Sequence, residues 1–128
     1  MAPDGPTSKY ADQKKIYEDL GHGILLNALN GYNCGLFAYG QTGAGKSYSI
    51  SGTFANKGLV PNFCERLFEK IKEKQESDKD IQFEVTFSMI EIYSEQVRDL
   101  LNPKGMANPK GLSVHERPGK GFHSKFFF

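Results

Sequence analysis

The sequence is short of several residue types, and each shortage excludes a class of protein. Its 128 residues include two cysteines, Cys34 and Cys64, and no tryptophan. Two thiols are too few for a disulfide framework or a metal site, so we expect both to be buried thiols in a reducing compartment. Neither sign of charge is in excess, because 16 lysines and arginines face 15 acidic residues, for a net charge of +1. A balance this even predicts no nucleic acid and no acidic partner.

Long hydrophobic runs are also missing. No apolar stretch approaches the length that crosses a bilayer, and the first residues lack the basic flank and apolar run of a signal peptide. We therefore predict a cytoplasmic protein with no membrane insertion. One segment, residues 69–79, alternates lysines with acidic residues, which is typical of a solvated helix end. A local basic surface formed by the fold stays an open alternative.

The first part of the chain shows a helical pattern. Residues 1–10 are rich in proline and glycine and predict an irregular lead-in. From Asp12 an apolar residue recurs every four positions, which predicts a helix ending at Asn30-Gly31, with a kink or short break at Gly21 and Gly23. The predicted apolar positions are Ile16, Leu20, Ile24 and Ala28, joined by Tyr17 and Leu25.

Two segments have strand patterns. Residues 34–39 are a short apolar run between glycines, which favours a strand buried on both faces, as in a parallel sheet. Residues 81–89 alternate strictly between apolar and polar side chains, which predicts a longer strand with a bulge or a change of burial at Met89-Ile90.

The remaining elements are shorter or less regular. Pro61 opens a predicted helix that runs to Lys74. Its apolar face is Val60, Phe63, Cys64, Leu67, Phe68 and Ile71. Ser94 suits the cap of a short helix over residues 95–101. After it we expect a loop over residues 102–111, the start of a strand near Leu112, and an end, residues 122–128, that fits no element.

One motif carries recognisable chemistry. Residues 40–47 match G-x-x-x-x-G-K-[ST], the phosphate-binding P-loop, placed between a predicted strand and a predicted helix from Lys46 to Ile50. Its glycines permit a backbone whose N–H groups converge on an anion, and the helix N-terminus adds a positive dipole. Lys46 is expected to reach the phosphate oxygens, and Ser47 to ligate Mg²⁺. The predicted nucleotide-binding residues are Gly40, Gln41, Thr42, Gly43, Ala44, Gly45, Lys46 and Ser47.

The other groups that hydrolysis needs are not found in the sequence. No apolar strand ends in the Asp-x-x-Gly pattern that supplies a second acidic residue for Mg²⁺. Asp99 falls in the predicted short helix, and Glu84 and Glu91 are interpreted as solvated or paired. The three histidines, His22, His115 and His123, have no partner at triad or metal spacing, so no catalytic residue is predicted.

Two stretches resemble the kinesin motor domain. Residues 31–48, which read GYNCGLFAYGQTGAGKSY, closely resemble the kinesin sequence around its P-loop. Residues 91–101, EIYSEQVRDLL, resemble the family's E-I-Y-N-E-x-V-x-D-L-L, with Ser94 where asparagine is usual. The resemblance covers residues 10–118, and residues 10–21 look most like the kinesin-3 group.

The resemblance implies a fold, cofactors and a partner. It implies an α/β fold, a three-layer sandwich around a mixed central sheet, incomplete in this chain. It also implies ATP on residues 40–47, Mg²⁺ at Ser47, and Tyr48 near the adenine, with ordinary packing as the alternative for Tyr48. In the complete protein the partner is the microtubule (tubulin), and the location is the cytoplasm and cytoskeleton. Oligomeric state is left open.

Departures from the family pattern shape the domain prediction. The first strand with its Arg-x-Arg-Pro contact, switch I, switch II, the main microtubule-binding helix and the neck linker do not occur in this sequence. We therefore divide the chain into a lead-in (1–10), a partial kinesin motor domain (11–118) and a divergent tail (119–128), and expect a truncation or a spliced-in end. Without the switch groups the ATPase cycle is not expected to run in this chain.

A P-loop also occurs in proteins with two other kinds of function. A self-contained P-loop kinase would need lid arginines, and the chain has three dispersed arginines, Arg66, Arg98 and Arg117. A non-catalytic, truncated nucleotide-binding or interaction fragment that keeps the loop as a relic stays the alternative. If the chain is part of a kinesin motor domain, as the resemblance implies, the isolated chain would expose the edges and faces of buried strands, which predicts low solubility or a molten state.

Overall fold

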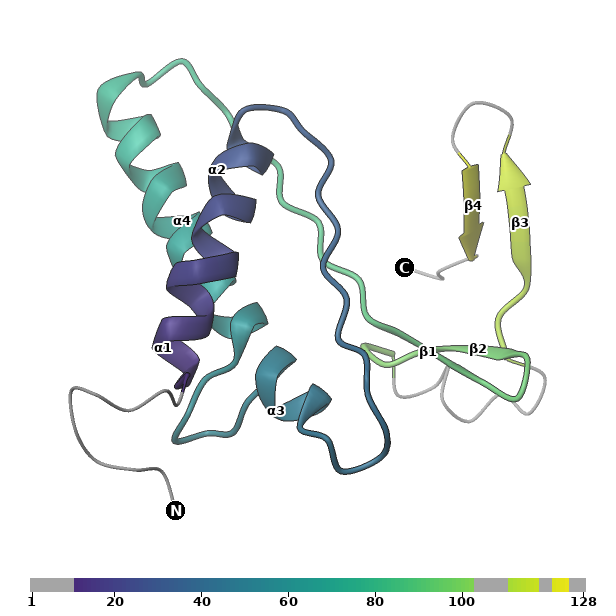
Figure 1. Ribbon diagram of the computed structural model, residues 1–128. Coiled ribbons are helices and arrows are strands. Elements are labelled where there is room, and N and C mark those ends of the chain that lie inside the picture. Colours follow the sequence, from purple (N-terminus) through teal and green to yellow (C-terminus); the bar gives the residue numbers. More distant parts are fainter. Residues whose placement is uncertain (1–10, 103–110, 118–120, 125–128) are drawn as a thin grey trace. The chain divides into compact units, whose positions relative to one another are not determined.

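The computed structural model describes residues 11–102, 111–117 and 121–124. The predicted lead-in, most of the predicted loop 102–111 and residues 125–128 lie outside the described residues. The described part divides into two units, one over residues 1–83 and one over residues 84–128. Each unit is described by itself, and the chain is drawn in Figure 1.

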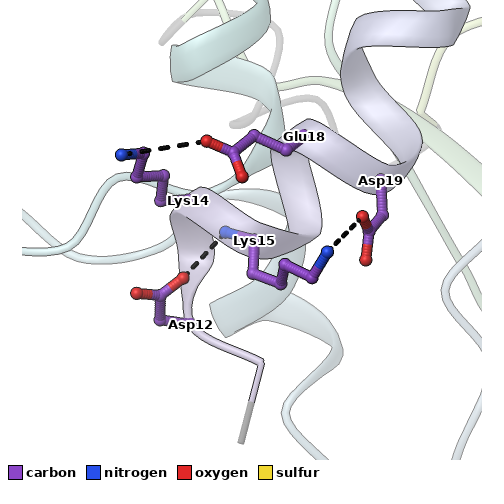
Figure 2. A network of polar contacts seen from close by, with 5 residues as sticks. All are labelled: Asp12, Lys14, Lys15, Glu18 and Asp19. Carbon is purple, nitrogen blue, oxygen red and sulfur yellow. Dashed lines mark hydrogen bonds and ion pairs between the residues drawn. The ribbon is translucent and has the colours of Figure 1, made fainter. Parts of the chain in front are cut away.

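The first unit begins with one continuous helical rod. It comprises α1 (Gln13–Ile16), a π-helical turn η1 (Tyr17–Gly21) and α2 (His22–Leu29). Asp12 caps it, because its Oδ1 accepts a hydrogen bond of 2.7 Å from the Lys15 N–H. Lys15 Nζ also donates to Asp19 at 2.7 Å, as Figure 2 shows. The hydrogen bond to Asp19 raises the pKa of Lys15, and the exposed pair adds modestly to the helix.

The predicted interruption at Gly21 and Gly23 takes the form of the π turn, and the helix does not break. A Cβ at Gly21 would lie 2.5 Å from Cδ2 of the Tyr17 ring. Glycine at this position therefore lets the ring lie across the helix backbone. Gly23 has open space around it, with nothing within 4 Å of a built Cβ, so only Gly21 has a packing role.

The buried face of this rod differs from the predicted one. Its buried residues are Gln13, Tyr17, Gly21 and Leu25, each four positions after the last. The predicted Leu20 is half exposed. With Ile16 it instead lines a groove of about 340 Å³ shared with residues 36–39 and with helix α3 (Lys46–Ile50). The predicted four-residue period was correct, but the face toward helix α4 (Leu59–Ser77) lies one residue later than the apolar stripe, because a glutamine and a glycine occupy half of that face.

A longer helix of the unit, α4 (Leu59–Ser77), confirms the helix predicted over residues 61–74 and extends beyond it at both ends. Leu59 and Ile71 are buried, and α4 packs against η1 and α2 (Figure 1). Val60 and Phe68, both predicted for the apolar face, are exposed. Its charged end is solvated as expected, with ion pairs such as Lys70–Glu73 at 2.6 Å. The hydrogen bond to Glu69 likewise raises the pKa of Arg66.

The two predicted strands, residues 34–39 and 81–89, are not strands in the structure, which gives them no ladder partner. Their side chains are almost all exposed, and Phe37 is 92% exposed. Cys34, predicted to be buried, is exposed, while Cys64 is half-buried. The physical reason is that a strand needs a neighbour for its N–H and C=O groups. The resemblance implies that such neighbours come from segments beyond this chain.

The second unit contains two antiparallel hairpins. In the first, β1 (Ile90–Tyr93) pairs with β2 (Gln96–Asp99), and Ile92 lies opposite Val97. Ser94 and Glu95 form the turn with φ of 48° and 64°, the two positive values of a type I′ turn. The predicted helix over residues 95–101 was therefore wrong, because Ser94 starts a hairpin turn instead of a helix.

The second hairpin pairs β3 (Val114–Arg117) with β4 (Gly121–Ser124). The strand expected near Leu112 is thus confirmed as β3, and Leu112 itself bridges to Val97. The end of the chain was predicted to fit no element, and β4 corrects this for residues 121–124. Among the described residues no helix is long and apolar enough to span a membrane.

Candidate functional site

The loop over residues 40–45 has the backbone that its glycines predict. Gly43 and Gly45 have φ of 83° and 88°, in the left-handed region that a residue with a Cβ adopts at a cost. Nothing lies within 4 Å of a Cβ built on either glycine. The glycines therefore allow this conformation without strain, and the loop keeps open space beside its backbone, as a phosphate cradle requires.

Lys46 lies across this loop. Its Nζ donates to the backbone oxygens of Gly40 at 2.6 Å and Gln41 at 2.7 Å. These two bonds tie the ammonium group to the start of the loop. Because a lysine ammonium has three N–H donors, one donor is left for an anion in this geometry.

The helix α3 (Lys46–Ile50) follows directly, as the sequence predicts. Its N-cap is Gly45, and no side chain caps its N-terminus, so its first N–H groups are not occupied by a cap. Ser47 lies in the first turn and is exposed, and Tyr48 follows it with 39% exposure. The hydroxyl of Ser47 is thus accessible at the end of the helix where a metal-phosphate group would bind.

The predicted site residues are brought together by one short segment. Gly40 and Lys46 are half-buried, while the residues between them and Ser47 are exposed. An accessible loop, a tethered ammonium group and a free hydroxyl fit a nucleotide phosphate with Mg²⁺. Their assignment to a ligand stays a prediction.

Another groove in the described residues lies away from the loop, and it is larger than the groove that Ile16 and Leu20 line. It measures about 810 Å³ and is formed by the α1–α2 rod, residues 54–57 and α4, without any residue of the loop 40–47. Cavity size alone would therefore point away from the P-loop.

The loop after α3 is closed at its base. Gly52 and Lys57 form an antiparallel bridge, and a Cβ on Gly52 would lie 2.2 Å from the Asn56 backbone oxygen and the Gly58 N. Asn62 Nδ2 donates to the Lys57 oxygen at 2.8 Å, and Lys57 pairs with Glu65. The short connection thus fixes the path from α3 into α4.

The acidic residues Glu84 and Glu91 are solvated or paired, as expected. Glu91 lies 3.9 Å from Arg98 as an ion pair, and Glu84 is exposed. Asp99 is buried on β2, where its Oδ1 accepts a 2.9 Å hydrogen bond from the Leu101 N–H. No group of three or more histidine, cysteine or acidic residues able to hold a metal occurs in the part of the chain that the structure describes.

One residue at this site was missed from the sequence. Gln13 Nε2 donates to the backbone oxygen of Tyr48 at 2.6 Å, so α1 is connected to α3. The available signal was a polar residue at four-residue spacing from Tyr17, on the face that packs inward.

Comparison with known proteins identifies the family. The Kinesin motor domain family matches residues 4–125. A rat kinesin-like protein KIF28 (Rattus norvegicus) is 50% identical over 122 residues, covering 95% of this chain and 11% of the relative. Human kinesin-like protein KIF13B (Homo sapiens) is 48% identical over 107 residues, 84% of this chain and 6% of the relative.

Solved structures agree with the sequence relatives. A KIF14 dimer with AMP-PNP in complex with a microtubule superposes with a TM-score of 0.75 at 38% identity, covering 95% of this chain and 33% of that one. KIF14 with ADP in complex with a microtubule gives a TM-score of 0.70 and covers 34% of that chain.

A P-loop between an extended segment and a short helix, with this backbone path, defines part of a kinesin motor fold. The chain belongs to the kinesin motor domain family. It spans about a tenth or less of the length of the two curated relatives described above and about a third of the solved KIF14 chains. The expected fold class, an incomplete kinesin α/β fold, is confirmed.

Proposed function

We propose that this chain is the ATP-binding part of a microtubule-based kinesin motor. ATP hydrolysis would drive movement along microtubules in the complete protein. The observation that carries the proposal is the joint placement of Gly43, Gly45, Lys46 and Ser47 where an extended segment meets a helix, on a backbone that matches kinesin motors.

Each residue would have a defined task. The loop over residues 40–45 would bind phosphate oxygens through backbone N–H groups. Lys46, positioned by its two bonds to loop carbonyls, would share its remaining N–H between the β- and γ-phosphate oxygens. Ser47 would hold Mg²⁺, which when bound bridges the phosphates and neutralises part of their charge. Tyr48 would lie near the adenine.

Hydrolysis and the microtubule belong to the complete motor. KIF14 is seen on a microtubule with AMP-PNP and with ADP, which supports a microtubule partner and a location on the cytoskeleton in the cytoplasm. The groups that position the attacking water are not among this chain's residues, so we assign the chain nucleotide binding and not turnover.

Nucleotide binding by the 128-residue chain tests the proposal. Fluorescent Mg·mant-ATP is titrated into the wild type, Lys46→Ala and Lys14→Ala. Lys14 is the matched control, because its side chain is 82% exposed on α1 and pairs with Glu18. We expect Lys46→Ala to weaken binding at least tenfold, since it removes a charge-assisted bond to phosphate, and Lys14→Ala to leave it unchanged.

A result of equal affinity in all three variants would overturn the nucleotide role. It would favour the alternative, a non-catalytic interaction fragment in which the P-loop persists without a ligand. The helical circular dichroism of each variant is recorded in parallel, so that a loss of binding is not mistaken for a loss of structure.

A further inference from the structure

The C-terminal end of α3 has an unusual hydrogen-bond partner. In a regular helix the oxygen of Tyr48 would accept from the N–H of residue 52. Here the Gly52 N–H donates to the oxygen of Ser47 at 3.1 Å, and Ser51 N–H donates to the same oxygen at 2.8 Å. The Tyr48 oxygen accepts instead from Gln13 Nε2, at 2.6 Å and 35 residues away in sequence. A side chain from α1 therefore takes the place of the helix's own last bond.

Gln13 is built into the interior for this contact. The residue is 8% exposed, yet its other amide atom, Oε1, is buried with no hydrogen-bond partner. An apolar side chain of similar length would fill the space without burying an unpaired acceptor. The bond from Nε2 to Tyr48 is therefore the feature that glutamine adds at this position.

The turn that carries Gln13 is firmly held. Asp12 caps the helix immediately before it, and the Lys14–Glu18 and Lys15–Asp19 pairs follow it on the exposed side (Figure 2). Gln13 thus projects from an anchored turn and not from a free end.

The helix at the other end of this bond depends on outside support. A helix of five residues, Lys46–Ile50, is too short to hold its own conformation. At its N-terminal end Lys46 bonds to the loop carbonyls, and in its middle Gln13 holds the carbonyl of Tyr48. Movement of Tyr48 would displace Lys46, because the two residues lie less than one helical turn apart.

We propose that Gln13 is a positioning residue for the nucleotide site. By holding the Tyr48 carbonyl it keeps α3 in register with the P-loop, so that Lys46 and Ser47 face the phosphates. This inference rests on the proposed function, and it assigns to α1 a direct influence on nucleotide affinity. A purely structural role would instead affect only the stability of the helix packing.

Gln13→Met separates these two roles in the 128-residue chain. Methionine has a similar length and lacks the donor. It removes the unpaired Oε1 acceptor but also leaves the Tyr48 oxygen without its partner, and because these effects oppose each other, the helical signal should be kept and thermal unfolding should change little. We expect the affinity for Mg·mant-ATP to fall about tenfold. We also expect the amides of residues 49–52 to exchange faster with deuterium, with no change in α4.

Two variants complete the design. Lys14→Met, on the same turn but with an exposed side chain, should change neither affinity nor exchange. Gln13→Glu keeps the shape but faces the Tyr48 oxygen with an acceptor, so it should weaken binding at least as much as Gln13→Met. Unchanged affinity and unchanged exchange at residues 49–52 in Gln13→Met would overturn the inference, as would a loss of affinity that only follows a general loss of helix.

The outcome also separates this inference from the proposed function. If neither the wild type nor Lys46→Ala binds Mg·mant-ATP, the proposed function fails, and the exchange of residues 49–52 alone decides whether Gln13 holds α3. If the wild type binds in a Lys46-dependent way and Gln13→Met binds equally well, the nucleotide role stands and the positioning role is overturned.

Discussion

The helical rod with α4 and the two extended segments of this chain use apolar residues in opposite ways. Tyr17, Leu25, Leu59 and Ile71 are buried where the helices meet. Residues 34–39 and 81–89 also carry large apolar side chains, but these are exposed, from 36% at Phe83 to 101% at Tyr39, and the segments have no ladder. A helix satisfies its backbone within itself and needs one neighbouring surface, whereas a strand needs partners for its backbone as well. The helical part can therefore form locally, while the extended part depends on a sheet.

The strongest test of this contrast replaces one leucine in the helical part. Leu25 is 2% exposed and its neighbour Leu26 is 42% exposed. Leu25→Ala should cost about 2–5 kcal/mol, because it removes buried methyl groups and leaves a cavity. A pairing surface this small has little stability to lose, so we expect most of the helical circular dichroism to disappear. Leu26→Ala should keep it, and equal losses in the two variants would contradict the described packing.

A pair of glycines gives the next largest effect. Gly21→Ala would place a Cβ 2.5 Å from the Tyr17 ring, so we expect a loss of about 1–3 kcal/mol from overpacking. Gly23→Ala meets nothing within 4 Å and should stabilise the helix by about 0.5–1 kcal/mol, because alanine restricts the unfolded chain. The rate of amide hydrogen exchange in α4 measures the change in stability for both variants. The same sign for both substitutions would show that the ring does not lie across Gly21.

The buried hydroxyl of Tyr17 predicts a smaller, pH-dependent effect. Burial raises its pKa, with Arg66 opposing and Glu69 adding to the shift. Because the folded pKa lies above the unfolded value of about 10, the helical part should lose stability as the pH rises above that value. Tyr17→Phe should flatten this loss. It should also be neutral or slightly stabilising near pH 7, since the hydroxyl has no hydrogen-bond partner.

The alkaline titration of Tyr17→Phe is compared with that of the wild type over the same pH range. Lysines and other tyrosines titrate there too, so the prediction concerns the difference between the two proteins. Helical signal followed from pH 7 upward should separate the curves only above about pH 10. Identical curves would mean that Tyr17 is solvated.

The smallest effect on helix stability is expected in the extended segment. Phe87 is 55% exposed. Phe87→Ser should therefore change the free energy of unfolding of the helical part by less than about 0.5 kcal/mol. The same change should raise the soluble fraction of the chain, because an exposed apolar strand promotes association. The expectation of low solubility or a molten state for the isolated chain would fail if the wild type stayed soluble and unfolded in one cooperative transition.

The elements that could be predicted from the sequence are those determined by residues close together in the chain. The loop 40–45, the helix at Lys46 and the helix α4 depend on glycines, a motif and a four-residue period, and all are present. The hairpin at Ser94-Glu95 was mistaken for a helix, because neither residue is the glycine or asparagine that usually marks two positive φ values. The partner of Tyr48 could not be predicted either, since periodicity gives the face on which Gln13 lies but not the atom that it reaches.

The bridge between Gly52 and Lys57 has a consequence for sequence variation. The loop closes at its base, and Asn62 and Glu65 of α4 contact Lys57 there. The residues between Gly52 and Lys57 therefore do not determine how α3 is connected to α4. Extra residues inserted between Phe54 and Ala55 should therefore enlarge the surface loop without moving either helix. The length of the loop can therefore vary there, in natural relatives or when a label is inserted. Substitution of Gly52 or Gly58 would instead disturb the connection between α3 and α4.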